Sequence, residues 1–497
     1  MMDGMACVRP GGSRPARAVG LWGVAAACVV FIWCGGVPAR AADGASSAAE
    51  AAGAATSTPA PAATPAEAAA DDLRARLAAL EKEVAALEAE IAILRATGAP
   101  AVSTADLERR IEALSKEVER LRIGAAAATT QAGQSVGGLG PAASKVYHAG
   151  RGVSIGGYGE VVYQDPSSKT DDGAPSGEST TADLQRAVLY FGYKFDDRWL
   201  FNSEIEFEHA VAGEGEKGEV EVEFAYVDYH RKQTLGARGG LLLVPMGFLN
   251  ELHEPPIFFG VERPEVEQVI IPTTWRELGG GVYGQAGPVS WKAYLLNSLD
   301  ASGFSADEGI REGRQEGAEA TANDLALTAR VDWVPVQGLL LGAGAFTGDT
   351  AQDASGVDGA RLLAWEAHAE YRWRGLKARA LLARNHLDDA AEVSALTGQV
   401  IGSSQVGYYV EAGYNIFDGR TTTSQELSPF VRYEAFDTQA AVPSGLTADP
   451  ANDRRDLTVG LHYRPIPNIA LKLDWQDQGN SAGTGVDRYS LGLGWLF

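Results

Sequence analysis

The sequence predicts an all-β transmembrane barrel of about sixteen antiparallel strands, preceded by a signal peptide and a short α-helical coiled-coil segment. The first reason is that apolar and polar residues alternate repeatedly over residues 151–497, and a period of two residues is typical of a strand with two different surroundings. The second reason is that short and long connections alternate between these stretches, which favours a transmembrane barrel over a soluble sandwich.

Residues 1–41 have the pattern of a secretory signal peptide. A basic start and an apolar centre at 18–34 precede a small-x-small cleavage site that ends at Ala41. All 3 cysteines lie in the first 34 residues, so the mature chain is expected to have no thiol and no disulfide. An uncleaved membrane anchor is the alternative, because the apolar stretch is almost long enough to cross a bilayer.

The next part of the chain is expected to hold helices between two linkers. Residues 42–70, rich in Ala, Pro and Thr, predict a tether, and residues 124–150 a second linker. Between them, residues 71–123 carry leucines at heptad spacing in two blocks that are out of register by one residue, which predicts two coiled-coil helices. Acidic residues that flank the apolar positions disfavour self-association of the first helix, so it is expected to pair with the second helix in an antiparallel hairpin or with a cationic partner. A single amphipathic helix on a surface is the alternative to a coiled coil.

Sixteen stretches of the remaining sequence fit strands, and an even number places both ends of the barrel on one side. They are 153–163, 183–195, 199–209, 219–230, 235–246, 278–285, 289–298, 323–334, 338–347, 361–372, 375–387, 405–415, 427–437, 455–464, 468–477 and 487–497. The connection 416–426 is the exception to the alternation, because it should be short and is not.

The strands have one apolar and one polar face. In the fourth strand, Val220, Val222, Phe224 and Tyr226 are expected to face lipid, opposite a run of glutamates. Sixteen strands enclose a lumen wide enough for water, so the polar face is predicted to line a pore. The expected pore-lining acids are Glu204, Glu206, Glu208, Glu219, Glu221 and Glu223, and the expected bases are Arg186, Lys194, Arg330, Arg372, Arg432 and Lys472.

The last strand ends on an aromatic residue and resembles the C-terminal signal by which outer-membrane barrels are recognised for insertion. Its alternating apolar residues are Tyr489, Leu491, Leu493, Trp495 and Phe497. The expected partners are therefore outer-membrane lipid and the outer-membrane assembly machinery.

Several motifs resemble the phosphate-selective porin O/P family over residues 150–497. They are LVPMG at 243–247, ERP at 262–264, WRELGGGVYG from 275, REGRQ at 311–315, PFVRYEAFDT at 429–438 and YRPIPNIALKLDWQ at 463–476. The resemblance implies a passive, water-filled channel for small ions or solutes, assembled as a homotrimer in the outer membrane of a Gram-negative bacterium, with the coiled coil in the periplasm. It also implies that the third long loop, 247–277, folds inward and narrows the pore.

The charges depart from the pattern of anion-selective members, which line the pore with Arg and Lys. The expected constriction residues in loop 247–277 are Glu251, His253, Glu254, Glu262, Arg263, Glu265, Glu267, Arg276 and Glu277. Together with the glutamates of the third and fourth strands they predict a pore that does not select strongly for phosphate or other small anions and can prefer cations.

No enzyme motif is apparent, and no catalytic, cofactor-binding or metal-ligating residues are predicted. His253-Glu254 lacks the second histidine of HExxH, and the chain has neither GxSxG before a helix nor GK[ST] in a loop. A net charge of −23 disfavours nucleic acid as a partner. The alternatives to a channel are a tethering protein whose coiled coil binds cell wall or a partner, with the barrel as anchor, and a barrel hydrolase.

Overall fold

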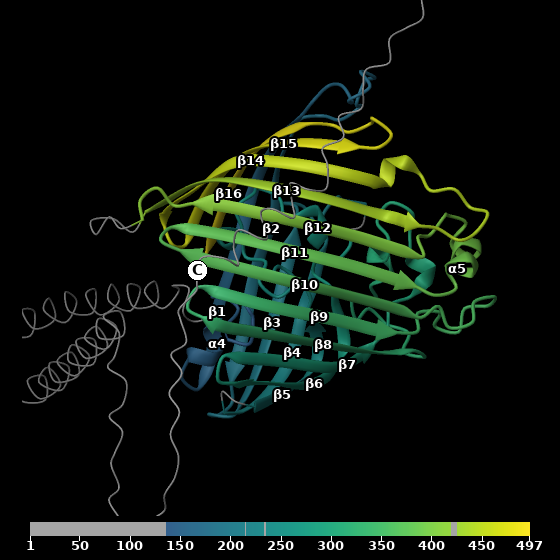
Figure 1. Ribbon diagram of the computed structural model, residues 1–497. Helices are drawn as coiled ribbons and strands as arrows, with labels where there is room; N and C mark the ends of the chain where they lie inside the picture. Colours follow the sequence, from purple (N-terminus) through teal and green to yellow (C-terminus); the bar gives the residue numbers. More distant parts are fainter. Residues whose placement is uncertain (1–135, 214, 233–234, 419–424) are drawn as a thin grey trace, which may run out of the picture. The chain divides into compact units, whose positions relative to one another are not determined.

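The computed structural model describes residues 136–213, 215–232, 235–418 and 425–497. They form a closed antiparallel barrel in which each strand pairs with its neighbours in sequence and β1 pairs with β16 (Figure 1). The strands are β1 (Gly152–Pro166), β2 (Thr181–Lys194), β3 (Trp199–Glu208), β4 (Val220–Lys232), β5 (Leu235–Leu243), β6 (Arg276–Ala286), β7 (Val289–Asn297), β8 (Leu325–Val336), β9 (Leu339–Gly348), β10 (Leu362–Trp373), β11 (Leu376–Leu387), β12 (Ser404–Tyr414), β13 (Glu426–Ala441), β14 (Asp453–Ile466), β15 (Ile469–Asn480) and β16 (Arg488–Leu496).

Short helices precede the first strand and lie in the connections between strands. The α-helices of the described residues are α4 (Lys145–His148) and α5 (Ala390–Thr397), and the 3-10 helices are η1 (Pro255–Ile257), η2 (Glu265–Glu267), η3 (Ala301–Gly303), η4 (Arg311–Gly313) and η5 (Pro450–Asn452). Among these helices, none has the length and apolar character needed to cross a membrane.

The predicted barrel is confirmed, and each of the sixteen predicted stretches overlaps one strand. Strand β5 ends three residues early, at Leu243, because Pro245 has no N–H to donate and the N–H of Val244 instead donates to the carbonyl of Trp275 at 2.8 Å. The expected signal peptide at 1–41, tether at 42–70 and coiled coil at 71–123 lie outside the described residues.

The two ends of the barrel differ in their connections. Short connections at 195–198, 233–234, 287–288, 337–338, 374–375 and 467–468 lie at one end, which we call the turn end. The longer connection 415–425 also lies there, as the sequence predicts. The opposite end, which we call the loop end, carries the long connections.

The barrel wall is apolar outside and polar inside. On β3, the side chains of Trp199 and Phe207 are both 45% exposed on the outer face, whereas Glu204 is 0% exposed inside. On β16, Tyr489 and Leu491 point outward, and Ser490 between them is fully buried. This division is the pattern of a barrel whose outer surface faces hydrocarbon.

Strand β4 corrects one prediction about the faces. The β3–β4 pairing shifts between Glu204 and Ile205, so that Glu204 pairs with Phe224 while Ile205 pairs with Val222. A bulge of this kind reverses the faces of the residues beyond it. Val222 therefore faces outward at 44% exposure, but Phe224, at 1%, and Tyr226, at 3%, are buried inside rather than facing lipid.

Candidate functional site: the barrel interior

The connection between β5 and β6, residues 244–275, folds into the barrel, and we call it the inward loop. Its backbone reaches the far wall, where the N–H of Val261 donates to Asp474 on β15 at 2.6 Å. Lys472 on the same strand donates to the carbonyl of Gly260 at 2.7 Å. The N–H of Val266 donates to Glu434 on β13 at 3.2 Å. The loop therefore crosses the lumen and is held by hydrogen bonds at its far side.

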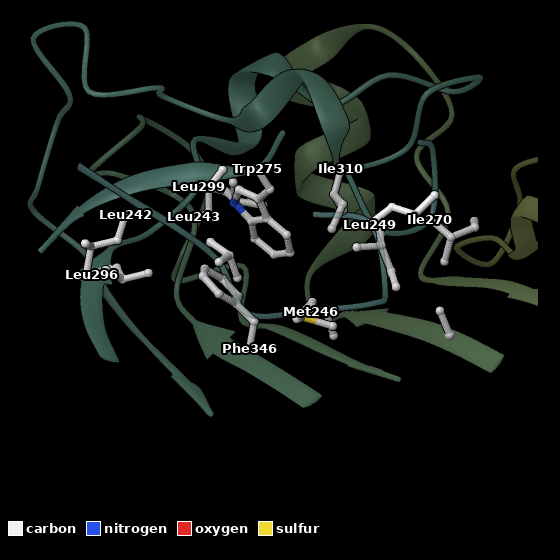
Figure 2. Close-up of a cluster of buried hydrophobic side chains, with 14 of the residues drawn as sticks. Leu242, Leu243, Met246, Leu249, Ile270, Trp275, Leu296, Leu299, Ile310 and Phe346 are labelled. Atoms are coloured by element: carbon white, nitrogen blue, oxygen red, sulfur yellow. The ribbon is translucent and has the colours of Figure 1, made fainter. Parts of the chain in front are cut away.

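An apolar cluster anchors the loop on its near side (Figure 2). The indole of Trp275 is fully buried, and its ring centre lies 4.5 Å from that of Phe346 on β9. Met246 and Leu249 of the loop, and Ile310 of the β7–β8 connection, belong to the same cluster. Burying side chains of this size stabilises the loop by about 1.5–3 kcal/mol each, so the loop is a fixed part of the core.

The glutamate Glu267 organises the backbone of the loop. Its carboxylate accepts the N–H groups of Phe248 at 2.6 Å and Leu249 at 2.7 Å. The hydroxyl of Tyr409 on β12 donates to the other oxygen at 2.5 Å. Both carboxylate oxygens of Glu267 accept hydrogen bonds from the protein, so this residue holds the loop in shape.

A second segment, residues 136–148, also lies inside the barrel, and we call it the plug. It was expected to belong to a linker, but Leu139, Ala142 and Val146 are each at most 2% exposed. The amide of Asn202 on β3 donates to the carbonyl of Ala143 at 2.9 Å. Small residues allow this segment to pack closely, so its Ala- and Gly-rich composition indicates a tight fit rather than a free tether.

The plug lies at the turn end, beside the start of β1 and the C-terminus. A side chain at Gly156 would meet the carbonyls of Ala142 and Phe497. The hydroxyl of Tyr147 donates to Asp228 at 2.7 Å. Asp228 is itself paired with Arg238 at 3.1 Å, so a buried polar network fixes the plug to β4 and β5.

Glu254 connects the plug to the inward loop. Its Oε1 atom accepts the N–H of Ala142 at 2.9 Å and the N–H of Ala143 at 3.2 Å. Burial raises the pKa of Glu254 to about 7, against the opposing effect of these two hydrogen bonds.

A cavity of about 390 Å³ remains at the loop end of the interior. Its charged lining comprises eight glutamates and five arginines: Glu160, Glu206, Glu208, Glu219, Glu221, Glu262, Glu312, Glu316, Arg186, Arg263, Arg276, Arg311 and Arg314. Several of these form ion pairs, such as Arg186 with Glu160 at 2.9 Å and Arg276 with Glu221. Eight glutamates against five arginines give this cavity an excess of acidic side chains, and Glu208 and Glu219 form no ion pair within the described residues.

A second cavity, of about 400 Å³, lies on the side of the inward loop that faces the plug. Its charged lining is Glu251, Asp332, Glu370, His230, Lys292, Arg330, Arg372 and Arg379. The lysine and the arginines here are paired, for example Lys292 with Glu251 and Arg330 with Asp332 at 2.8 Å. The two cavities share no lining residue, and the inward loop separates them.

The structure places the twelve expected pore-lining residues in three groups. Those at the loop-end cavity are Arg186, Glu206, Glu208, Glu219 and Glu221. Those at the second cavity are Arg330 and Arg372. Those in contact with the inward loop or the plug are Glu204, Glu223, Arg432, Lys472 and Lys194.

The expected constriction residues also separate. Glu262 and Arg263 line the loop-end cavity, Glu251 lines the second one, and Glu265 lines a separate pocket at the loop end together with Arg454. His253, Glu254 and Glu267 are buried contacts within the protein. Arg276 and Glu277 were expected in the loop but are the first two residues of β6, because this strand begins two residues earlier than predicted.

His253 lies between carboxylates of two strands. Its Nδ1 atom donates to the carbonyl of Asn250 at 3.0 Å, and its Nε2 atom lies 3.2 Å from Glu204 and 3.3 Å from Glu223. Burial acts to lower the pKa of His253, but the two carboxylates outweigh burial and raise it to about 10.

Sequence reasoning missed several interior residues. Lys292 and Arg379 follow the same inward alternation as their neighbours on β7 and β11, so the face pattern contained the signal that predicts them. Arg311 and Arg314 come from the β7–β8 connection, and no local pattern shows that this connection returns to the lumen. Arg238 on β5 pairs with Asp228 of β4 and lies over the rings of Tyr226 and Tyr283 inside the barrel.

No protein-family model matches the chain. Among solved structures, it is similar to OmpF of Salmonella typhi in complex with daunomycin, with 12% identity and a TM-score of 0.46 over 69% of this chain and 97% of that chain. It is also similar to an anion-selective porin from Comamonas acidovorans, with 14% identity and a TM-score of 0.44 over 69% of this chain and 99% of that chain.

A sequence relative covers most of the chain. An uncharacterized protein of Aquifex aeolicus (strain VF5) is 40% identical over 375 residues, which are 72% of this chain and 83% of that protein. The protein therefore belongs to the same family as the Aquifex aeolicus protein.

Proposed function

We propose that the protein is an outer-membrane porin that lets small ions and solutes diffuse passively through a narrow, polar passage. The observation that carries this proposal is the barrel itself, with an apolar outer face and two cavities with charged side chains in their linings, on opposite sides of an inward loop. A barrel that serves only as a membrane anchor needs only its apolar outer face. Charged cavities inside a barrel are useful to a protein that passes polar solutes.

The proposed passage is narrow because the inward loop and the plug occupy much of the lumen. Their hydrogen bonds to β3, β13 and β15 hold them in place, so solutes would be selected by the gaps beside them. The motif resemblance supports a homotrimer, and the turn end would face the periplasm, as short turns do in outer-membrane barrels.

The charge distribution supports a channel that disfavours anions at its loop-end entrance. Screening at physiological salt acts over about 8 Å, so charges on the wall of a small cavity influence every ion that enters it. Glutamates outnumber arginines there, and the arginines Arg186 and Arg276 are paired with glutamates. We therefore propose a preference for cations over phosphate or chloride.

Single-channel recording tests the channel function. Protein extracted in folded form and added to a planar bilayer is expected to give discrete conductance steps, smaller than those of an unobstructed sixteen-stranded barrel. Liposomes that contain the protein are expected to swell in small sugars and amino acids but not in larger oligosaccharides. Folded protein that inserts without adding conductance or swelling would contradict the proposal.

A further inference from the structure

We propose that Glu204, Glu223 and His253 form a binding site for one divalent first-row transition cation, such as Mn²⁺, Co²⁺ or Zn²⁺. The three side chains come from β3, β4 and the inward loop, so the ion would fasten the loop to the barrel wall. This site goes beyond the proposed channel function. It was not predicted from the sequence, because the ligands are far apart in the chain and form no local motif.

The geometry of the cluster fits a single ion. The three ligand atoms all lie within 4.8 Å of one another. Two ligands about 2.1 Å from one ion lie about 3.0–3.4 Å apart at octahedral or tetrahedral angles. The Nε2 atom of His253 lies 3.2 Å from Glu204 Oε1 and 3.3 Å from Glu223 Oε2, which is the spacing of neighbouring ligands.

The imidazole is oriented as in metal sites. Its Nδ1 must donate to the carbonyl of Asn250, at 3.0 Å, because a carbonyl only accepts. A backbone acceptor of this kind fixes the ring and directs Nε2 to the ion. One nitrogen and two carboxylate oxygens form a ligand set that suits first-row divalent cations.

The carboxylates have bonding capacity that the protein does not fill. Nε2 carries at most one hydrogen, which cannot satisfy two carboxylates. Oε2 of Glu204 and Oε2 of Glu223 have no hydrogen-bond donor within the described residues, although the two side chains are 0% and 1% exposed. An imidazolium balances one of the two negative charges, whereas a divalent cation beside a neutral imidazole balances both. Unfilled, buried carboxylate oxygens are therefore the second observation that points to a ligand.

An ion can approach the cluster from the loop-end cavity. Glu206 lines that cavity, and its carboxyl group lies close to that of Glu223. The acidic lining of the cavity concentrates cations at this entrance. A cation entering from the loop end would meet Glu206 first and the three ligands next.

Titration of the folded full-length protein tests the site. Protein in detergent is stripped with a chelator and titrated with Co²⁺, whose visible absorption reports nitrogen and oxygen ligands, and with Mn²⁺ followed by electron paramagnetic resonance. The expected result is one saturable site per chain, from which Zn²⁺ displaces Co²⁺. A stripped wild-type protein that binds no stoichiometric Co²⁺ or Mn²⁺ would overturn the proposal.

Variants separate this site from weak binding to surface acids. Glu204→Gln with Glu223→Gln keeps the shapes of both side chains and is expected to weaken Co²⁺ binding more than about 100-fold, because loss of a group that only hydrogen-bonds to a metal ligand already costs about 10–100-fold. If the double variant does not fold, as judged by heat-modifiable migration, the single variant Glu223→Gln is titrated with Co²⁺ in its place. Undiminished binding in a folded variant would overturn the proposal.

His368 provides a matched control. It also contacts two carboxylates, but Asp332 lies 2.9 Å from Nε2 and Glu366 lies 2.7 Å from Nδ1, so the two acids are on opposite ring nitrogens. One ion cannot take the place of both contacts. His368→Gln is expected to leave Co²⁺ binding unchanged, and an equal loss in this variant would overturn the assignment of the site to His253.

Discussion

At the scale of single residues, Glu254 joins the two segments that fill the barrel. Replacing it with Ala removes the acceptor for the N–H groups of Ala142 and Ala143 and leaves both buried donors without a partner. We expect Glu254→Ala to loosen the plug and to raise the mean single-channel conductance. Glu254→Gln keeps an acceptor oxygen and is expected to conduct as the wild type does. Equal conductance in all three proteins would contradict this role.

His253 gives the interior a pH dependence of known sign. Its pKa is about 10 in the folded protein, whereas an unfolded histidine has a pKa of about 6.5. The folded state therefore holds the proton more tightly, and this stabilisation is complete below the unfolded pKa and is lost as the pH rises through the folded pKa. The charges that face the ring are Glu204 and Glu223 of the wall and Glu254 beside it in the loop.

The prediction concerns thermal unfolding in the presence of a chelator. Between neutral pH and pH of about 10, the wild-type melting temperature is expected to fall more than that of His253→Gln, which has no proton to lose at this position. Circular dichroism at several pH values measures both proteins under the same conditions. An equal fall of the melting temperature with pH in both proteins would show that His253 does not contribute to the pH dependence of stability.

At the scale of elements, the plug is separable from the barrel wall. The wall is closed by its own backbone pairs, including β1 with β16, and these do not involve residues 136–148. We expect replacement of 136–148 by a Gly/Ser sequence of equal length to leave a heat-modifiable, inserted barrel with a larger conductance. Failure of this variant to fold would show that the plug is required for closure, and an unchanged conductance would place the narrowest point elsewhere.

The last strand closes the wall, and its final residue takes part. The N–H of Phe497 donates to the carbonyl of Gly157 at 2.8 Å, and Gly157 donates back at 3.0 Å. These bonds use the backbone, and the side chain is 49% exposed, so Phe497→Ala removes little packing. We expect this variant to slow assembly into the membrane more than it lowers the stability of the folded barrel. The measurement is the assembly rate of Phe497→Ala in a reconstituted system, with Leu491→Ala as the control.

The elements show which features a sequence can reveal. Strands could be predicted because each one carries its own two-sided pattern, as Trp199, Glu204 and Phe207 do on β3. The bulge that turns Phe224 inward could not be predicted, because one extra residue leaves the local alternation almost intact. The plug was missed since small residues are typical both of linkers and of segments packed against a wall. His253 meets Glu204 across 49 residues, and only the tertiary fold brings them together.

At the scale of the whole molecule, the barrel separates two surroundings. Its outside is apolar, and its inner wall carries many charged side chains, several of them paired across strands or with the inward loop. Near the second cavity the opposite charges of ion pairs, such as Arg330 with Asp332, cancel each other. The loop-end cavity keeps an excess of glutamates, so ion selectivity is expected to be decided at that end.

The reversal potential across a planar bilayer under a potassium chloride gradient tests this account most directly. The wild-type channel is expected to favour K⁺, and Glu208→Gln with Glu219→Gln is expected to shift the reversal potential toward chloride, because both residues line the loop-end cavity. Glu319→Gln, an exposed residue outside that lining, is the matched control and is expected to behave as the wild type. A wild-type channel that already prefers chloride, or a shift in the control as large as in the double variant, would contradict the account.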